Sequence, residues 1–225
     1  MEKLEKVETY KDKAYKAIKA SIINQDFQPG TQLNERELAE RLGISRTPIR
    51  EALKKLENDG WVKTEPWLGT FVMDILENDI EEIFQIRTAL DPLIMELLIK
   101  KADTNDILKI EKFLGEQHII IQKSKKVSIE NFDDFHLFLA GLTGNKKLIQ
   151  IMENIADMKI RLDIETLKSQ KRREEVILEH QQLLYSLKEK DIPKAKQMAS
   201  EHVVKARDKL LKNWAHGVGE HNTHK

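Results

Sequence analysis

The most constraining feature of the sequence is the long stretch after Asp74, where apolar residues recur at the spacing of amphipathic helices and strand signals are missing. A chain with this pattern folds as a helical bundle. Local capping signals, such as Gly144-Asn145 and Asp191-Ile192-Pro193, divide the stretch into separate helices. We expect helices at about residues 79–101, 104–124, 128–141, 145–168, 171–190 and 193–215.

The residues before Asp74 carry a different pattern, in which short helices are followed by two runs of β-branched and aromatic residues. Asn34 and Ser45 are capping residues at the starts of two of these helices. We expect helices at 10–24, 35–42 and 45–59 and the strands of a hairpin at 61–64 and 70–73. Helix, short helix, tight turn, helix and hairpin is the order of a winged helix-turn-helix.

The predicted fold is therefore mainly α, with an N-terminal winged helix-turn-helix and its small β-hairpin wing at residues 1–75, and an all-helical bundle at 76–216. Residues 217–225 are polar and glycine-rich, and we expect a flexible tail. The chain has no cysteine, which excludes disulfides, thiolate metal sites and cysteine nucleophiles. We expect no membrane segment and a cytoplasmic protein, because no apolar run is long enough to cross a bilayer and the N-terminus is charged.

The third predicted helix carries cations on the face opposite its apolar stripe. Arg46, Thr47 and Arg50 lie on this outer face. Arginine can donate two parallel hydrogen bonds to guanine N7 and O6, which makes this the pattern of a DNA-recognition helix. Such charges on a surface helix are often only solvated, and the 38 basic and 38 acidic residues of the chain cancel. The neighbouring Arg36 and Arg41, the tight turn and the hairpin favour DNA binding.

The stretch LNERELAERLGISRTPIREALKKLENDGWVKTEPWLGTFV resembles the DNA-binding domain of the GntR family of bacterial transcriptional regulators, and the helical remainder resembles the FadR-type subgroup with an FCD ligand-binding domain. The resemblance implies that Arg36, Arg46, Thr47 and Arg50 contact DNA and that Gly69 lets the wing approach the minor groove. It also implies a homodimer that binds a pseudo-palindromic operator in double-stranded DNA, with 76–216 as the effector-binding and dimerisation domain.

The tip of the predicted wing departs from the family pattern. Trp67 and Leu68 stand where a small or polar residue is frequent in the family. Trp67 either stays at the wing tip or packs against the core of its domain.

Three histidines, His136, His180 and His202, fall on the inward faces of three different predicted helices. A single inward histidine is usually a core residue with a satisfied hydrogen bond. Three imidazoles that converge inside a bundle form a nitrogen-rich cluster suited to Zn²⁺, Ni²⁺ or another borderline divalent ion. Both interpretations remain open at the level of the residues.

The FCD resemblance favours the metal, because these histidines match the metal-site landmarks of that family. The family commonly places an acidic ligand four residues before the first histidine, and Phe132 occupies that position here. Asp133 is the nearest replacement, so the predicted ligands are Asp133, His136, His180 and His202.

In that family a small carboxylate metabolite binds beside the metal, and cations are expected near it. Arg87 and Arg161 are the candidate effector-binding residues, although each could instead form an ion pair, for example Arg87 with Asp91. The sequence thus indicates a transcriptional regulator controlled by a small organic acid, acting either as repressor or as activator. The alternatives are a regulator that responds to the metal itself or to no ligand, and a metal-dependent enzyme fused to a DNA-binding domain, for which we find no catalytic motif.

Overall fold

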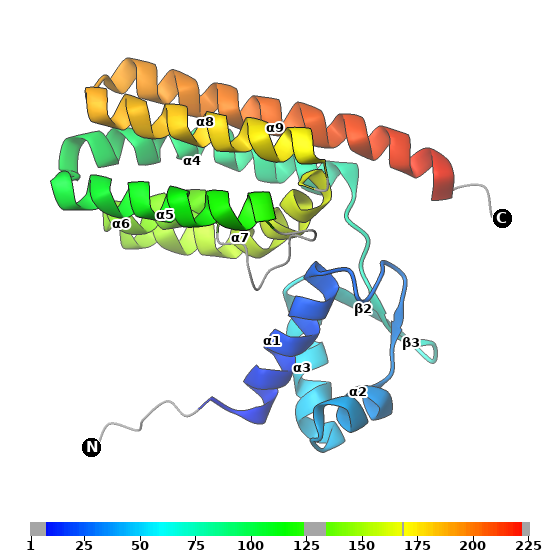
Figure 1. The fold of residues 1–225 in the computed structure, drawn as a ribbon. Helices are drawn as coiled ribbons and strands as arrows, with labels where there is room; N and C mark the ends of the chain where they lie inside the picture. Colours follow the sequence, from blue (N-terminus) through cyan, green and yellow to red (C-terminus); the bar gives the residue numbers. More distant parts are fainter. Residues whose placement is uncertain (1–7, 124–133, 168, 222–225) are drawn as a thin grey trace, which may run out of the picture. The chain divides into compact units, whose positions relative to one another are not determined.

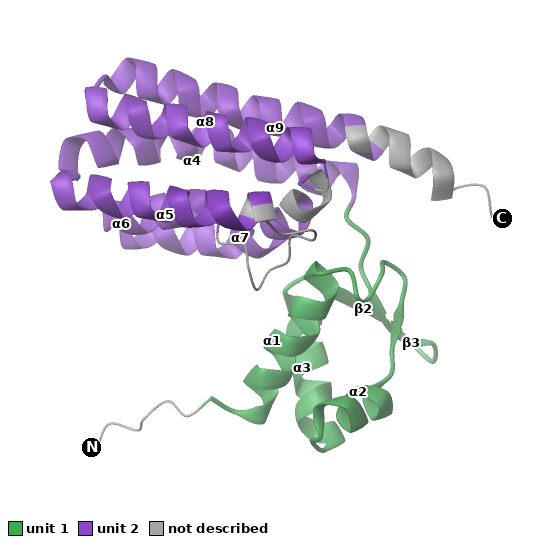
Figure 2. Ribbon diagram, viewed as in Figure 1, with its two compact units in different colours: residues 1–75 green, residues 76–225 purple. Residues whose placement is uncertain are grey.

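The chain forms two compact units, residues 1–75 and 76–225 (Figure 2). The structure, a computed structural model, describes residues 8–123, 134–167 and 169–221. Within these ranges the first unit combines helices with a small sheet, and the second contains helices without a strand. The predicted mainly α fold is therefore confirmed.

The first unit is the predicted winged helix-turn-helix. Its elements are α1 (Tyr10–Ile23), β1 (Gln32–Leu33), α2 (Glu35–Leu42), α3 (Arg46–Asn58), β2 (Val62–Glu65) and β3 (Gly69–Val72) (Figure 1). Asn34 caps α2 by accepting hydrogen bonds from the backbone amides of Arg36 and Glu37. Gly43 ends α2 in the left-handed conformation, with φ of 64°, and so makes the tight turn into α3.

The sheet has three antiparallel strands in the order β1-β3-β2. The β2–β3 hairpin was predicted, with Val62 paired to Val72 and Glu65 to Gly69. The short strand β1, which pairs Gln32 with Phe71, was not. A strand of two residues is too short to show the alternation of apolar and polar residues by which strands are predicted. β1 forms because its backbone can pair with the edge of β3 that β2 leaves open.

Helix α3 packs its apolar face into the core of the first unit, against α1. Ile49, Ala52 and Leu56 of α3 are fully buried, and so are Ile18 and Ile22 of α1. Burying this face fixes the rotation of α3 about its axis. The opposite, polar face is therefore presented to solvent.

The second unit is an all-helical bundle. Its helices are α4 (Glu77–Lys101), α5 (Thr104–Lys123), α6 (Phe135–Thr143), α7 (Lys146–Thr166), α8 (Gln170–Glu189) and α9 (Ile192–His221). α4 runs alongside α9, and α8 contacts both α5 and α9 (Figure 1). The core includes Ile94 and Leu98 of α4, Leu139 of α6 and Leu183 of α8.

Two predicted helix boundaries are wrong. The helix predicted from residue 128 begins at Phe135, because the side chain of Asp134 caps it by accepting from the amides of His136 and Leu137; residues 128–133 lie outside the described part of the chain. The last helix continues to His221 rather than ending near 215, so part of the predicted tail is helical.

Helix α4 contains a proline, Pro92, fifteen residues after its start at Glu77. Proline lacks the amide that would donate to the carbonyl one turn earlier, so the hydrogen-bond ladder of α4 is interrupted at this point. Among the described helices, none is long and apolar enough to cross a membrane.

Candidate DNA interface and candidate metal centre

The polar face of α3 carries the side chains predicted to contact DNA. Arg46, Thr47 and Arg50 are all exposed, and so is Arg36 on α2. Arg46 and Arg50 start from successive turns of α3 and both reach Glu35 of α2, at 3.4 and 2.8 Å. The structure thus brings the two α3 arginines together on one exposed surface, where they can reach the edges of bases in a major groove.

The tip of the wing contacts Gln32 of strand β1. Gly69 has φ of 117°, a conformation that side chains rarely adopt, and a Cβ there would lie 2.8 Å from Nε2 of Gln32. The same Gln32 nitrogen donates to the carbonyl of Leu68 at 2.6 Å. Trp67 is fully exposed and also has positive φ, at 67°. Trp67 therefore stays at the tip, and the alternative in which it packs on the core is wrong.

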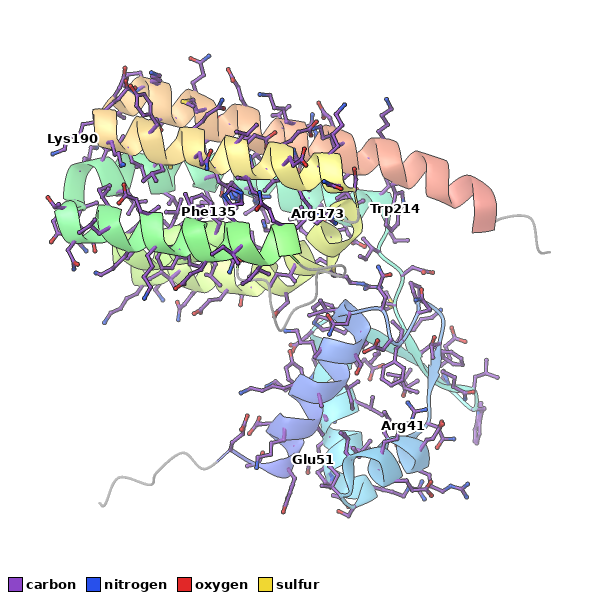
Figure 3. All side chains as sticks on the ribbon, in the orientation of Figure 1. Arg41, Glu51, Phe135, Arg173, Lys190 and Trp214 are labelled. Carbon is purple, nitrogen blue, oxygen red and sulfur yellow. The ribbon has the colours of Figure 1, made fainter. Side chains whose placement is uncertain are left out.

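In the second unit the structure brings together His136 of α6, His180 of α8 and His202 of α9. Their ring centroids lie 5.0 to 5.5 Å apart, and one nitrogen from each ring lies within 4.8 Å of the others. His136 and His202 are buried; His180 is half-buried as a residue, but its ring is enclosed by the bundle. The adjoining Phe135, labelled in Figure 3, lies in the interior between the helices.

Two carboxylates orient two of the rings. Nδ1 of His136 lies 2.9 Å from Asp91, and Nδ1 of His202 lies 2.8 Å from Glu179. Burial raises the pKa of Asp91, but Arg87 and His136 outweigh it and hold that pKa well below its ordinary value. Burial likewise raises the pKa of Glu179, but its bonds with His202 and Arg172 lower it to about 2. Both carboxylates are therefore ionised, and each Nδ1 carries the ring proton.

The other nitrogens of these two rings face each other. Nε2 of His136 lies 3.1 Å from Nε2 of His202. With the protons on Nδ1, both Nε2 atoms present lone pairs, which repel at this distance unless a proton or a cation lies between them. Burial lowers the pKa of His202 to about 4, although Glu179 raises it, and burial holds the pKa of His180 well below its ordinary value. At neutral pH, protonation of His202 or His180 is therefore disfavoured.

This donor set fits a divalent cation. Nitrogens bound at 2.0–2.1 Å with angles of about 90–110° lie roughly 2.8–3.4 Å apart, a range that includes the observed 3.1 Å. Histidines whose second nitrogen is held by a carboxylate are typical of metal sites. The predicted fourth ligand, Asp133, and Phe132 lie outside the described residues. Asp134 is occupied as the cap of α6.

A cavity of about 30 Å³ adjoins the histidines. Three cations line it, Arg87 of α4, Lys159 of α7 and Arg172 of α8, beside apolar side chains such as Phe84 and Leu167. Arg87, one of the two predicted effector-binding residues, thus lies in the wall of the cavity. Arg161 is buried on α7 but is outside the set of described residues that line the cavity.

Each cation of the cavity is paired with an acid: Arg87 with Asp91 at 2.8 Å, Arg172 with Glu179 at 3.0 Å, and Lys159 with Asp134 at 3.5 Å. The pair of Arg87 and Asp91 is the alternative that the sequence left open. The site therefore contains two arms, each an arginine, a carboxylate and a histidine, which meet at the Nε2 atoms.

Sequence reasoning missed Glu179, Lys159 and Arg172, and it did not foresee that Asp91, named as a possible partner of Arg87, also contacts His136. Glu179 directly precedes His180, and Asp91 follows Arg87 by one helical turn, but neither spacing tells which histidine on another helix the acid contacts.

Comparisons with known proteins cover both units. The family model described as bacterial regulatory proteins, gntR family, matches residues 10–72, and the FCD domain model matches residues 82–205. An uncharacterized HTH-type transcriptional regulator, YdhC of Bacillus subtilis, is 32% identical over 202 residues, which cover 89% of this chain and 90% of the relative. The Uxu operon transcriptional regulator of Escherichia coli is 31% identical and covers 86% of this chain and 84% of its own.

Solved structures share the fold. McbR/YncC of Escherichia coli superposes with a TM-score of 0.71 at 20% identity and covers 92% of this chain and 99% of its own. A putative transcriptional regulator GntR from Rhodococcus sp. RHA1 gives a TM-score of 0.72 at 18% identity, covering 90% and 97%. The named relatives are transcriptional regulators rather than enzymes.

The buried pair of Arg87 and Asp91 predicts a strong effect on stability. In protein treated with a chelator, Arg87→Met should lower the free energy of unfolding by roughly 3 kcal/mol, because it leaves a buried carboxylate without its cation. Adding Asp91→Asn should restore much of the loss, because the amide carries no charge and its oxygen can still accept from Nδ1 of His136. Urea unfolding measures both. Lys100→Met, which removes an exposed pair with Glu96 on the same helix, is the control and should change little. An unchanged Arg87→Met variant would mean that this arginine is not held by the pair.

Proposed function

Because this chain belongs to the GntR family of bacterial regulators and carries an FCD domain, it is a DNA-binding transcriptional regulator, and we propose that a small carboxylate metabolite, bound beside a divalent metal ion, controls its affinity for DNA. The observation that carries the proposal is the pair of Nε2 atoms of His136 and His202, 3.1 Å apart in a buried site. His136, His180 and His202 would hold the ion, and Zn²⁺ or Ni²⁺ suits three neutral imidazoles.

Charge balance supports an anionic effector. The ion pairs around the site already neutralise one another, and burial lowers the pKa of His180 and of His202, which disfavours their charged forms. A divalent ion would add two positive charges to a buried region, which favours the binding of an anion. When bound, the metal supplies open coordination positions for a carboxylate oxygen. Arg87, Lys159 and Arg172 stand where they could reorient toward the same ligand.

Control of DNA binding requires that the effector favour one of two conformations of the regulator. The site draws residues from α4, α6, α8 and α9, so a ligand there can change the packing of four helices. A cavity of about 30 Å³ holds little more than water, so a metabolite requires its walls to move. That movement is the proposed conformational signal. Effector affinity and operator affinity are then reciprocally linked.

We propose that the chain binds DNA as a homodimer through the second unit. Ile86 and Leu93 of α4 are exposed, and they lie seven residues, about two helical turns, apart on one face. A second copy of the chain is the partner that a pseudo-palindromic operator requires.

A second candidate function is a regulator that senses the metal itself. The small volume of the cavity favours it, because an ion with one or two waters needs no movement of the walls. Operator binding that changes with Zn²⁺ or Ni²⁺ alone, and that small carboxylates do not alter further, would favour this function over the first.

The DNA interface predicts the effect of removing one arginine. Arg50→Ala should weaken binding to a duplex selected from a random pool by about 1–3 kcal/mol and should relax the preference at one base position, because a bidentate base contact is lost. Fluorescence anisotropy with the selected duplex and single-position variants measures this. Lys112→Ala, which removes a more exposed cation in the second unit, is the control. Equal affinities for Arg50→Ala and the native chain would show that α3 does not read the operator.

The metal site predicts the metal content of the purified protein. The native chain should hold about one Zn²⁺ or Ni²⁺, measured by elemental mass spectrometry, and should melt at a lower temperature after chelation. His180→Ala with His202→Ala should remove both the metal and the response to small carboxylates while DNA binding stays measurable. His118→Ala, on α5 and outside the cluster, is the control. Metal retained in the double variant would reject the three-histidine site.

The exposed face of α4 predicts the oligomeric state. Leu93→Arg should convert a dimer into a monomer in sedimentation analysis, since it places a charge in the proposed apolar interface. Leu178→Arg on α8, where the native leucine is even more exposed, should leave the dimer intact. A dimer that persists in the Leu93→Arg variant would exclude this face as the interface.

A further inference from the structure

An acidic side chain lies among the arginines of the candidate DNA interface. Glu35 is the first residue of α2, and its carboxylate crosses the helix-turn-helix to reach α3. Nε and Nη2 of Arg50 donate to its two oxygens at 3.0 and 2.8 Å, and Nη2 of Arg46 donates at 3.4 Å. The capping of α2 is performed by Asn34, so the Glu35 carboxylate is not needed for that role.

This acid opposes general DNA binding. The hydrogen bond from Arg50 lowers the pKa of Glu35, and the same bond raises the pKa of Arg50, so both groups are charged at neutral pH. A carboxylate on a surface that approaches phosphates repels them and partly cancels the charge of the two arginines. Its presence lowers the affinity for DNA of any sequence.

The geometry of the contact shows how Glu35 can orient the guanidinium of Arg50. A guanidinium has a side edge, formed by Nε and Nη2, and an end edge, formed by Nη1 and Nη2. Glu35 takes the side edge of Arg50 with two bonds, which leaves the end edge to donate to N7 and O6 of a guanine. A side chain held in this way has fewer conformations in which it could instead contact a phosphate.

The arginines of α2 differ from Arg50. Arg36 contacts Glu40, and Arg41 contacts Glu37, each through a single nitrogen of the guanidinium at 3.5 and 3.4 Å and within the same helix. Such pairs leave the guanidinium free to turn toward a phosphate. Of these three arginines, Arg50 alone makes a bidentate contact, and its contact joins α3 to α2.

From this geometry we propose that Glu35 is a positioning residue that sets operator specificity: it holds Arg50 with its end edge toward the base, which increases discrimination for guanine at one position of each half-site at the expense of general affinity. The inference rests on the proposed reading of DNA by α3. Glu35 itself need not contact DNA.

The test compares Glu35→Gln with the native chain on three duplexes: the selected operator, the operator changed at the position where Arg50→Ala loses its preference, and a random sequence. We expect Glu35→Gln to bind the random duplex more tightly, with a salt dependence steeper by about one phosphate contact. The ratio of affinities for operator and changed operator should fall by roughly tenfold.

Two further variants make the test specific. Glu35→Asp keeps the charge but shortens the side chain; positioning predicts lost discrimination, whereas simple repulsion predicts native behaviour. Glu51→Gln removes an exposed acid from α3 (Figure 3) and should strengthen binding to all three duplexes by a similar factor. In an Arg50→Ala background, Glu35→Gln should no longer change discrimination.

The inference is overturned if Glu35→Gln raises affinity for all three duplexes equally, since the acid would then act only as a repulsive charge. It is also overturned if every affinity falls together with the melting temperature, because the role would then be structural. Failure of the underlying function is distinguishable: in that case Arg50→Ala itself would leave the affinity for the selected duplex unchanged.

Discussion

The close approach of two histidine nitrogens is the interaction on which the interior of the bundle depends. His136 and His202 come from helices far apart in the sequence, and each is held from behind by a carboxylate that an arginine keeps ionised. The lone pairs on Nε2 of His136 and Nε2 of His202 therefore point toward the same position. The arrangement is unfavourable without a positive charge at that point, and a bound cation would turn it into the link between α6 and α9.

The two candidate sites use the same motif, a carboxylate between an arginine and a second group, under different conditions of solvation. In the bundle, Asp91 and Arg87 are buried together, so each requires the other to avoid an uncompensated charge. On the DNA-binding surface, Glu35 and Arg50 are both in contact with solvent and could exist apart at little cost. The contact of Arg87 with Asp91 therefore affects the stability of the fold. The contact of Arg50 with Glu35 can change without loss of stability, so it can serve the selectivity of DNA binding.

The parts of the structure that could be predicted are those with local causes. Asn34, Gly43 and the apolar stripe of α3 define the helix-turn-helix from neighbouring residues, and helical periodicity alone places the three histidines inward. Strand β1 could not be predicted, because its cause is the distant edge of β3. The start of α6 at Phe135 was not predicted, because Asp134 caps the helix at a later point than the apolar periodicity indicates. The partners of the histidines depend on which helices are neighbours, which no single helix encodes, and so Arg172 was missed while Arg161 was chosen.

Helix α4 connects these sites along the chain, because it begins at Glu77, directly after the first unit, and carries Arg87 and Asp91. From Glu77 to Asp91 it forms about 21 Å of continuous helix, which is stiff on this scale. Pro92, the next residue, interrupts the ladder and makes the helix more compliant on the far side of the site. A displacement at Asp91 therefore meets less resistance to bending beyond Pro92 than before it. The N-terminal part of α4 would then move as a rigid segment, while the part after Pro92 bends.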